Sequence, residues 1–444
     1  MGIETLLVFV FGIIGGIFSG IMPGMGGLAL MLMIYPILVE LQPQNILIFY
    51  VVMISIDQFF AGLTAIIFGV PGSSMSVYSS YEGHTLMKQG RGSEAIMYSA
   101  ISSWMTSLFG VVLILALVPI LFLVYKVWNT NIQAVLFGFT SIVIVMVSRN
   151  RLYMSILLLI IGNLLGEIGY SHVFNRNFFT FDSPVLYSGI PIMPVLVSLF
   201  MIPLFLSTLQ HGKKTFEFPG VTLDGYWNSF KNIMLYRWTL LRTGLLGSIG
   251  GFVPGMAYGM SSLLGYTVER SVQQKKGTYK QGNMECLIAS EGANNAGTFT
   301  QLVPLLFLGI PITASEAIIY NILENRGYPV TIEWFQSTFT TVIIFFLISS
   351  TIGLFLAGKY VNMLKIIDGL NIRHVYLFIL TLLFGTIYWM GSQVWAGVDY
   401  LIITACLIPL GVLLRHRDTV PLIFGFVLHD TLFDVGNRVL IMYT

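Results

Sequence analysis

The fold is decided by the stretch Gly16-Ile17-Phe18-Ser19-Gly20-Ile21-Met22-Pro23-Gly24-Met25, in which a Pro-Gly break interrupts strongly apolar sequence. Proline removes a backbone donor and glycine loosens a helix, so a bilayer tolerates such a break only where protein or a water-filled cavity satisfies the freed groups. Three further breaks follow the same pattern: Gly69-Val70-Pro71-Gly72, Pro254-Gly255-Met256 and Gly309-Ile310-Pro311. One pair of breaks falls in each half of the chain, and matching breaks of this kind indicate a transporter binding site.

Composition places the chain in a membrane before any other motif is considered. Hydrophobic residues make up 56% and charged residues 9% of the 444 residues, and the mean hydropathy is +0.83; these values exclude a soluble globular protein. Several apolar runs are long enough, singly or with tilt, to cross a hydrocarbon core of roughly 30 Å. They are residues 6–22, 95–124, 132–147, 154–168, 185–209, 339–357, 375–390 and 400–414. With the broken segments added, the sequence predicts about ten to twelve membrane-inserted helices.

The apolar runs predict helices rather than strands. They are continuous and rich in Leu, Ile, Phe and Met, whereas a membrane barrel alternates apolar and polar residues. The predicted fold class is therefore all-α, a polytopic integral membrane protein. The first run is preceded by Glu4 and no basic residue, and it lacks a small-residue cleavage site, so we expect a helix of the mature protein.

Other classes of function find little support in the sequence. Cys286 and Cys406 lie in apolar surroundings without metal-binding spacing, and a net charge of +2 from scattered Lys and Arg gives no signal for nucleic acid. The sequence has no HExxH, no P-loop, no dinucleotide fingerprint and no GxSxG. We therefore expect no enzyme, no cofactor and no nucleic-acid partner. Uphill transport would have to draw on an ion gradient or on a separate subunit.

The breaks also predict an internal duplication. Pro254 lies 231 residues after Pro23, and Pro311 lies 240 residues after Pro71, with similar residues around the first break of each half. The longer polar stretch of residues 270–283, between the two breaks of the second half, accounts for the difference between these two offsets. The copies are weakly identical, but their breaks keep the same order.

Loop charge indicates how the two copies are oriented, because short cytoplasmic loops collect Lys and Arg. The link between breaks has no basic residue in the first half (40–45) and four in the second half (270–283). The stretch after the second break reverses this, with Lys88 and Arg91 in the first half and only Arg326 in residues 323–333. Equivalent loops on opposite sides are typical of inverted-topology repeats.

The resulting division has four parts. Residues 1–125 form the first repeat, 126–230 scaffold spans, 231–333 the second repeat and 334–444 C-terminal scaffold spans.

In the first half, the second break leads into a cluster of hydroxyl groups. A helix restarting after Pro71-Gly72 would offer free N–H groups and the positive end of its dipole beside Ser73 and Ser74. This arrangement predicts a cradle for a carboxylate. The alternative is a simple kink in which the serines cap or pack helices.

In the second half, the richest stretch is Ser290-Glu291-Gly292-Ala293-Asn294-Asn295-Ala296-Gly297-Thr298. Paired asparagines beside a carboxylate are costly inside a membrane unless they face a site, and amides can both donate to an anion and accept from a cation. The alternative is that these side chains form structural hydrogen bonds between helices.

Cation coupling has its own candidates, and the only metal ion expected is Na⁺. Asp57 has no basic neighbour, so it could ligate Na⁺ or carry a proton; the alternative is a helix-end residue that faces water. The full set of candidates is Asp57, Thr64, Glu291 and Thr298.

At this point the chain resembles a known family, the large membrane subunit of the tripartite tricarboxylate transporters (TctA-like). The resemblance covers about residues 12–110 and 247–329. Its most specific parts are Met22-Pro23-Gly24-Met25-Gly26, Thr64-Ala65-Ile66 leading to Val70-Pro71-Gly72, Glu82-Gly83-His84 with Met87-Lys88-Gln89-Gly90-Arg91, Val253-Pro254-Gly255, Glu291-Gly292-Ala293-Asn294-Asn295-Ala296 and Leu308-Gly309-Ile310-Pro311. Ile312 departs from the family, where a glycine stands, and would crowd a backbone approach; the glycine-rich segment before Thr64 is altered as well.

The resemblance implies a secondary importer of the bacterial inner membrane. A periplasmic solute-binding protein would deliver an organic anion such as a di- or tricarboxylate, a small four-helix membrane subunit would assist, and a Na⁺ or H⁺ gradient would drive uptake. A homodimer is a further expectation. The breaks and the resemblance together assign substrate binding to Pro23, Gly24, Met25, Gly26, Pro71, Gly72, Ser73, Ser74, Pro254, Gly255, Asn294, Asn295, Pro311 and Thr313. The rival interpretation is a non-transporting receptor or assembly protein of transporter descent.

Overall fold

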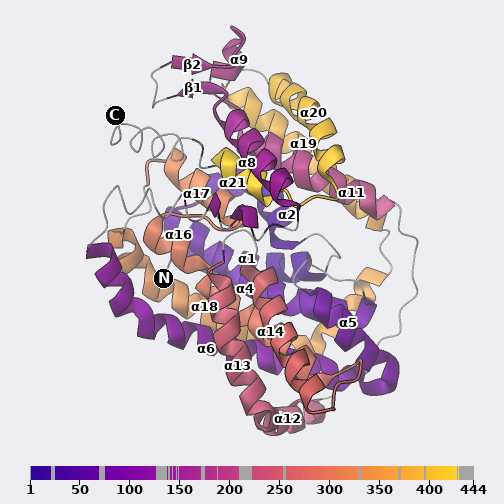
Figure 1. The fold of residues 1–444 in the computed structure, drawn as a ribbon. Helices are drawn as coiled ribbons and strands as arrows, with labels where there is room; N and C mark the ends of the chain where they lie inside the picture. The colour runs from indigo at the N-terminus through magenta and orange to yellow at the C-terminus, as the bar shows by residue number, and fades with distance from the viewer. Residues whose placement is uncertain are drawn as a thin grey trace.

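The computed structural model describes residues 2–21, 26–69, 76–126, 138, 141–142, 144–146, 148, 150–171, 176–187, 189–209, 223–253, 257–328, 332–368, 372–394, 397–427 and 429. These residues are almost entirely helical (Figure 1). The described chain holds one short antiparallel hairpin of β1 (Gly169–Ser171) and β2 (Arg176–Phe178), with Tyr170 opposite Asn177. The predicted all-α fold class is confirmed.

The first half is a series of helices separated by the predicted breaks. Its elements are α1 (Ile3–Ile21), α2 (Gly26–Met33), α3 (Tyr35–Glu40), α4 (Pro43–Phe68), α5 (Val77–Leu86), the turn η1 (Met87–Arg91) and α6 (Gly92–Lys126). Helix α4 begins at Pro43, where the missing N–H has no helical partner to lose. It ends at Gly69, whose φ of 63° suits glycine because it has no Cβ.

The second half repeats this order of elements. It consists of α13 (Arg237–Gly251), α14 (Ala257–Lys275), α15 (Met284–Thr300), α16 (Leu302–Leu308), α17 (Ala314–Asn325) and α18 (Ile332–Asp368). Helix α16 ends at Gly309 with φ 65°, so the glycines before both second breaks adopt the left-handed conformation. Asn283 caps α15 by accepting a hydrogen bond of 3.0 Å from the N–H of Cys286.

Shorter helices connect and extend the two halves. They are α8 (Leu152–Gly166), α9 (Pro184–Tyr187), α10 (Ile192–Leu196), η2 (Val197–Met201), α11 (Ile202–Leu209), α12 (Leu223–Asn232), η3 (Ile233–Tyr236), α19 (Ile372–Val394), α20 (Gly397–Leu414) and α21 (Val420–Val427). The predicted single run of residues 185–209 is wrong at its start. Gly189 has φ 80° and Pro191 is extended, so the helix that continues to Leu209 begins at Ile192.

The same glycine packing occurs in both halves. On α1, a Cβ at Gly16 would lie 2.5 Å from the carbonyl oxygen of Met53, and one at Gly20 would lie 2.7 Å from that of Asp57. On α13, Gly247 and Gly251 approach the carbonyls of Ala293 and Gly297 on α15 in the same way. The α13 pair lies 231 residues after the α1 pair, and the α15 pair lies 240 residues after the α4 pair. Small residues thus let both helix pairs pack backbone to backbone, at the offsets that the breaks predict.

The equivalent helices α4 and α15 cross in opposite directions. Gln58 contacts Asn294, Gly62 contacts Glu291, and farther along Gly83 of α5 lies against both Ile66 and Leu287. Residue numbers rise along α4 as they fall along α15. The long helices are exchanged between halves, since α6 packs on α15 and α18 packs on α4. The inversion of the two copies itself stays a prediction.

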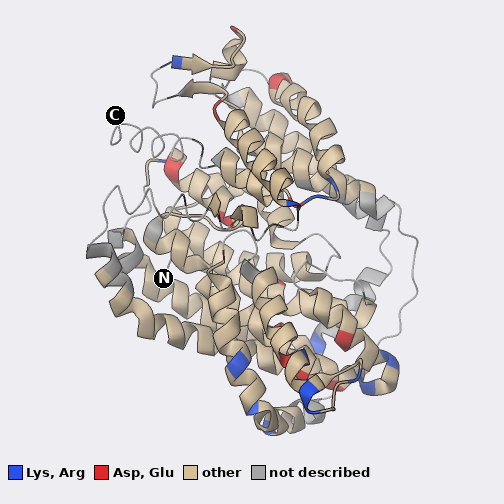
Figure 2. Ribbon diagram, viewed as in Figure 1, with Lys and Arg blue, Asp and Glu red and all other residues tan. Residues whose placement is uncertain are grey.

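Five helical segments of the described chain are long and apolar enough to cross a membrane, judged by length and composition. They are Ile3–Ile21, Pro43–Phe68, Val77–Ile120, Ser337–Lys359 and Gly397–Leu414. The fully buried segment is Pro43–Phe68, so α4 lies at the centre of the protein. The predicted total of membrane-inserted helices includes broken segments and stays a prediction. Lys and Arg gather at the lower end of the molecule, around α5, α12 and the adjoining ends of α13 and α14 (Figure 2).

Candidate functional site

A chain of buried polar groups joins the two halves where α4 crosses α15. The amide of Asn294 donates to Oε1 of Gln58 over 2.9 Å, and Nε2 of Gln58 donates to Oδ2 of Asp57 over 3.2 Å. Ser19 of α1 donates to the other Asp57 oxygen at 2.5 Å. Asp57 is 2% exposed, so the alternative of a water-facing residue at a helix end is wrong. Three helices from both halves thus share one hydrogen-bonded cluster.

The paired asparagines face different helices of the first half. Asn294 bonds α4 as described, whereas the amide of Asn295 donates to Oγ of Ser103 on α6 over 2.8 Å and to the carbonyl of Glu291 over 3.0 Å. Both side chains are buried. The two amides therefore hold α15 between α4 and α6.

Glu291 is a fully buried carboxylate one turn before Asn294. The hydroxyl of Ser79 on α5 donates to its Oε1, and the carboxylate lies directly against Gly62 of α4, where any Cβ would collide with it. Ser99 of α6 also interacts with this carboxylate. Among the described residues, Oε2 of Glu291 and Oδ1 of Asn294 nevertheless lack a hydrogen bond of normal geometry. Neither ion pair of the described chain, Arg91–Glu94 or Arg242–Glu269, involves these groups.

Two buried acceptors on one helix face that find no partner within the described part of the chain are costly, because each loses its hydration without compensation. A proton on the carboxyl group or a bound cation would relieve that cost. The cluster is therefore chemically suited to take up a proton or Na⁺, and the described contacts suit either ligand.

The two threonines among the cation candidates donate their hydroxyl hydrogens to backbone carbonyls. Thr64 reaches the carbonyls of Gly20 and Phe60 at 2.8 and 2.9 Å, and Thr298 reaches the carbonyl of Asn294 at 3.0 Å. Through Gly20, Thr64 fastens α4 to the last turn of α1 before the first break. Both threonines are buried and adjoin the cluster through the backbone.

The second break of the second half lies apart from this cluster. Thr313 accepts from the N–H of Glu316 over 3.2 Å, while Oε2 of Glu316 accepts from the N–H groups of Ile312 and Thr313 at 2.9 and 3.1 Å. This reciprocal pattern is a capping box that starts α17. The side chains of Thr313 and Glu316 therefore both stabilise the start of α17.

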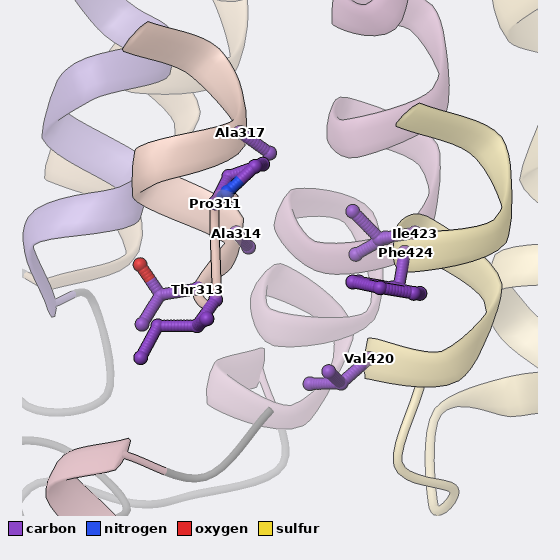
Figure 3. A pocket seen from close by; sticks show the side chains of 8 residues that line it. Pro311, Thr313, Ala314, Ala317, Val420, Ile423 and Phe424 are labelled. Carbon is purple, nitrogen blue, oxygen red and sulfur yellow. The ribbon is translucent and has the colours of Figure 1, made fainter. Parts of the chain in front are cut away.

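A small cavity of about 20 Å³ adjoins this break, between α17 and α21 (Figure 3). It is lined by Pro311, Ile312, Thr313, Ala314, Ala317, Val420, Ile423 and Phe424. A space of that size holds about one water molecule and is too small for a di- or tricarboxylate. Ile312 is 3% exposed and packs with Ile310 and Phe424, so the residue that replaces a family glycine fills this region.

Several predicted site residues lie outside the described residues. They are Pro23, Gly24, Met25, Pro71, Gly72, Ser73, Ser74, Pro254 and Gly255. Gly26, the first residue of α2, has φ 58° and no atom within 4 Å of a Cβ built on it. The described structure brings together Asp57, Asn294 and Glu291, with Asn295, Thr64 and Thr298 beside them.

Sequence reasoning missed most partners of these residues. Gln58 could have been found as an amide inside an apolar helix, the feature that identified Asp57. Ser19, Gly62, Ser79 and Ser103 carry no local signal, because their role depends on a distant helix. Sequence reasoning gave Glu82 no role beyond the family resemblance, whereas the structure places it on α5 and buries it fully.

A helical membrane protein whose broken-helix halves bury carboxylates and amides at their crossing has the architecture of a secondary transporter. The chain belongs to the tripartite tricarboxylate transporter TctA family, which it matches over residues 6–423. It is therefore a transporter subunit rather than an enzyme. The family implies a solute-binding protein and a small membrane subunit as partners.

Two similar proteins come from Agrobacterium vitis. One, described as an uncharacterized 52.8 kDa protein in the TAR-I ttuC' 3' region, is 26% identical over 457 residues, which cover 100% of this chain and 89% of that protein. The other, an uncharacterized protein in the TAR-II ttuC' 3' region, is 33% identical over 81 residues, or 18% of this chain and 34% of that protein. No solved structure matches the sequence significantly.

Proposed function

We propose that this chain is the translocating subunit of a binding-protein-dependent secondary transporter that imports di- or tricarboxylates, or related organic anions, across a bacterial inner membrane with Na⁺ or H⁺. The observation that carries the proposal is the buried cluster at the crossing of α4 and α15, where Glu291 and Asn294 each keep one oxygen without a hydrogen bond of normal geometry to any described residue. Polar groups inside a membrane mark ion and substrate paths, because their burial is otherwise unfavourable.

Inverted-topology repeats are part of the proposal. The antiparallel crossing of α4 and α15, and the glycine contacts repeated at offsets of 231 and 240 residues, support them. In this architecture the site lies between the copies near the bilayer midplane, and access alternates as one unit moves against the rest. In the proposed architecture, the crossing of α4 and α15 is this site between the two copies.

The substrate would bind at the breaks of the two halves. Helix α5 begins at Val77, just after the residues of the first-half second break, and its first N–H groups together with Ser73 and Ser74 would suit a carboxylate. The corresponding places in the second half are Pro254-Gly255 and the residues around Asn294. Membership of the family supports the organic-anion class.

Cation coupling would act through Glu291 and Asp57. A proton on Glu291 would give Oε2 hydrogen to donate, and the adjacent Asn294 Oδ1 is an acceptor on the same helix face. Na⁺ would instead need several oxygen ligands, which Glu291, Asn294 and nearby backbone carbonyls could supply. Glu291→Gln imitates the protonated carboxyl and removes the anionic ligand, so it should abolish gradient-driven uptake with either ion.

A second candidate is a receptor or assembly protein of transporter descent. The observation that favours it is the tight apolar packing of Ile312, which leaves a cavity of only about 20 Å³ beside Pro311. Such a protein would bind the solute-binding protein without moving solute.

Uptake by proteoliposomes separates the two functions. The subunit is reconstituted with the small membrane subunit and supplied with the solute-binding protein, and radiolabelled citrate and succinate are followed with and without an inward Na⁺ or proton gradient. Gradient-dependent accumulation is expected of the importer. Binding of the solute-binding protein without accumulation is expected of the receptor.

A further inference from the structure

Helix α5 inserts a carboxylate from the first half into the second half. Glu82 is fully buried, and its Oε1 accepts from the hydroxyls of Tyr266 and Tyr279 at 2.9 and 3.0 Å. Its Oε2 accepts from the backbone N–H groups of Gly282 and Asn283 at 2.7 and 2.9 Å. Four donors of the second half therefore hold one side chain of the first.

These donors are placed where a negative charge is favourable. Gly282 and Asn283 immediately precede α15, so Glu82 lies at the positive end of that helix. The guanidinium of Arg270 lies 5.9 and 4.9 Å from the ring centroids of Tyr266 and Tyr279. Hydrogen bonds to an ionised group are stronger than neutral ones, so this contact is a firm attachment between α5 and the α14–α15 link.

A contact of the opposite charge, made by a residue that is exposed where Glu82 is buried, lies at the other end of the site helices. Arg326 follows α17, and its Nη1 donates to the carbonyls of Val39, at 2.9 Å, and of Leu41. These carbonyls belong to the end of α3 and to the link before α4. A cation is favourable there, because the last carbonyls of a helix have no partners within it.

The two contacts have corresponding places in the two halves. Each charged residue follows the second break of its own half, and each holds the link before the long site helix of the other half. Since α4 and α15 run antiparallel, the links before them lie at opposite ends of the crossing. The Glu82 contact adjoins η1, whose Gln89 donates to the carbonyl of Gln281 in the basic α14–α15 link, at the end of the molecule where Lys and Arg gather (Figure 2).

We propose that Glu82 and Arg326 are reciprocal gate residues, each closing one end of the path between the two halves. Release of Glu82 opens the Lys- and Arg-rich end and release of Arg326 opens the opposite end. Both contacts are formed in the described structure. The transport meaning of the gates rests on the proposed function. The opening of each end can be measured without transport.

The chain carries its own reporter for the Glu82 gate. Cys286 is buried in the first turn of α15, beneath the Glu82 contact, and Cys406 is the other cysteine, exposed on α20. In a Cys406→Ser background, Cys286 is the single thiol. A membrane-impermeant maleimide applied to inside-out vesicles then measures how often the Lys- and Arg-rich end opens. Leu38, 1% exposed at the end of α3, serves as a second reporter when Leu38→Cys is combined with Cys286→Ala.

We expect Glu82→Ala to raise the labelling rate of Cys286 by about tenfold or more, since the lost bonds to an ionised group no longer oppose local opening. Tyr279→Phe removes one donor and should give a smaller increase, which keeps the test available if Glu82→Ala does not fold. The matched control is Glu94→Ala at the same end, where Glu94 pairs with Arg91 at the surface. That control should leave the labelling rate unchanged.

Arg326→Ala should raise labelling of the Leu38→Cys reporter in right-side-out vesicles and leave Cys286 labelling unchanged or lower. An unchanged Cys286 rate in both Glu82→Ala and Tyr279→Phe overturns the proposal. An equal rise of both reporters in either variant also overturns it, because that result shows general loosening rather than a gate. Side-specific labelling in a protein that transports nothing would retain the gates and reject the transport function.

Discussion

Gln58 of α4 and Asn294 of α15 are joined by a hydrogen bond of 2.9 Å between their side-chain amides, although 236 residues separate them in the chain. Both side chains are buried, and Gln58 passes the connection on to Asp57. Because Gln58 bonds both Asn294 and Asp57, a movement of α15 relative to α4 changes the hydrogen bonding around the carboxylate of Asp57. The contact therefore ties the geometry of the crossing to its electrostatics.

Asn294→Ala should abolish uptake while leaving folded protein in the membrane. The change removes the donor to Gln58 and leaves that buried amide oxygen unsatisfied, at a cost of about 1–3 kcal/mol in the free energy of unfolding. Asn295→Ala should behave similarly through the loss of Ser103. Uptake and thermal unfolding of the purified protein measure both effects. Unchanged uptake in the two variants would remove the asparagines from the site.

A double-mutant cycle measures the amide pair directly. Gln58→Ala combined with Asn294→Ala should show a coupling free energy of about 0.5–2 kcal/mol, the range found for hydrogen bonds between membrane helices. Chemical unfolding of the four proteins supplies the values. Strict additivity would mean that the two side chains do not interact in the protein.

Gly62→Ala should lower the free energy of unfolding by about 1–3 kcal/mol, because the added methyl group collides with the carboxylate of Glu291 and forces α4 and α15 apart. Gly385→Ala is the matched control. Gly385 lies inside α19, and a Cβ there would meet no atom within 4 Å. The control should be neutral or slightly stabilising, since alanine is the better helix former. Equal effects at the two positions would contradict the close contact at Gly62.

Thr313→Ala should destabilise the protein by about 1 kcal/mol through the loss of the α17 cap. Thr313→Ser should restore most of that stability, because it keeps the accepting hydroxyl. If capping is the role of Thr313, apparent substrate affinity should fall only in the variant that loses stability. Thr313→Ser should then transport like the natural protein. Loss of substrate affinity in the serine variant with full stability would instead place the threonine methyl group in the substrate site.

Much of the fold follows from local sequence. Apolar runs of sufficient length predicted α1, α6, α8, α19 and α20 close to their observed bounds, because a bilayer requires continuous helical hydrogen bonding. The run of residues 339–357 also predicted a helix, but α18 extends beyond it at both ends. The left-handed glycines at Gly69 and Gly309 end their helices where the breaks were predicted. The run of residues 185–209 failed at Gly189 and Pro191, since hydropathy alone does not register a change of backbone direction.

The candidate site was predictable only in part. Asp57, Glu291 and Asn294 were found because polar side chains stand out in apolar sequence. Their partners Ser19, Gly62 and Ser79 are ordinary small residues, and only the crossing of distant helices gives them a role. Glu82 was not singled out, for the same reason: the tyrosines and N–H groups that bond its carboxylate lie about 200 residues farther along the chain.

Comparing uptake by the natural protein and by Glu291→Gln tests the central claim, cation coupling at the buried cluster, most directly. Proteoliposomes containing the natural subunit or Glu291→Gln, with the small subunit and an external solute-binding protein, are given radiolabelled citrate, succinate or an aromatic acid under an imposed Na⁺ or proton gradient. We predict gradient-dependent accumulation of at least one acid by the natural protein. We also predict loss of gradient-driven accumulation in the correctly inserted variant. Accumulation that ignores both gradients, or that survives Glu291→Gln with its ion dependence intact, would contradict coupling at this cluster.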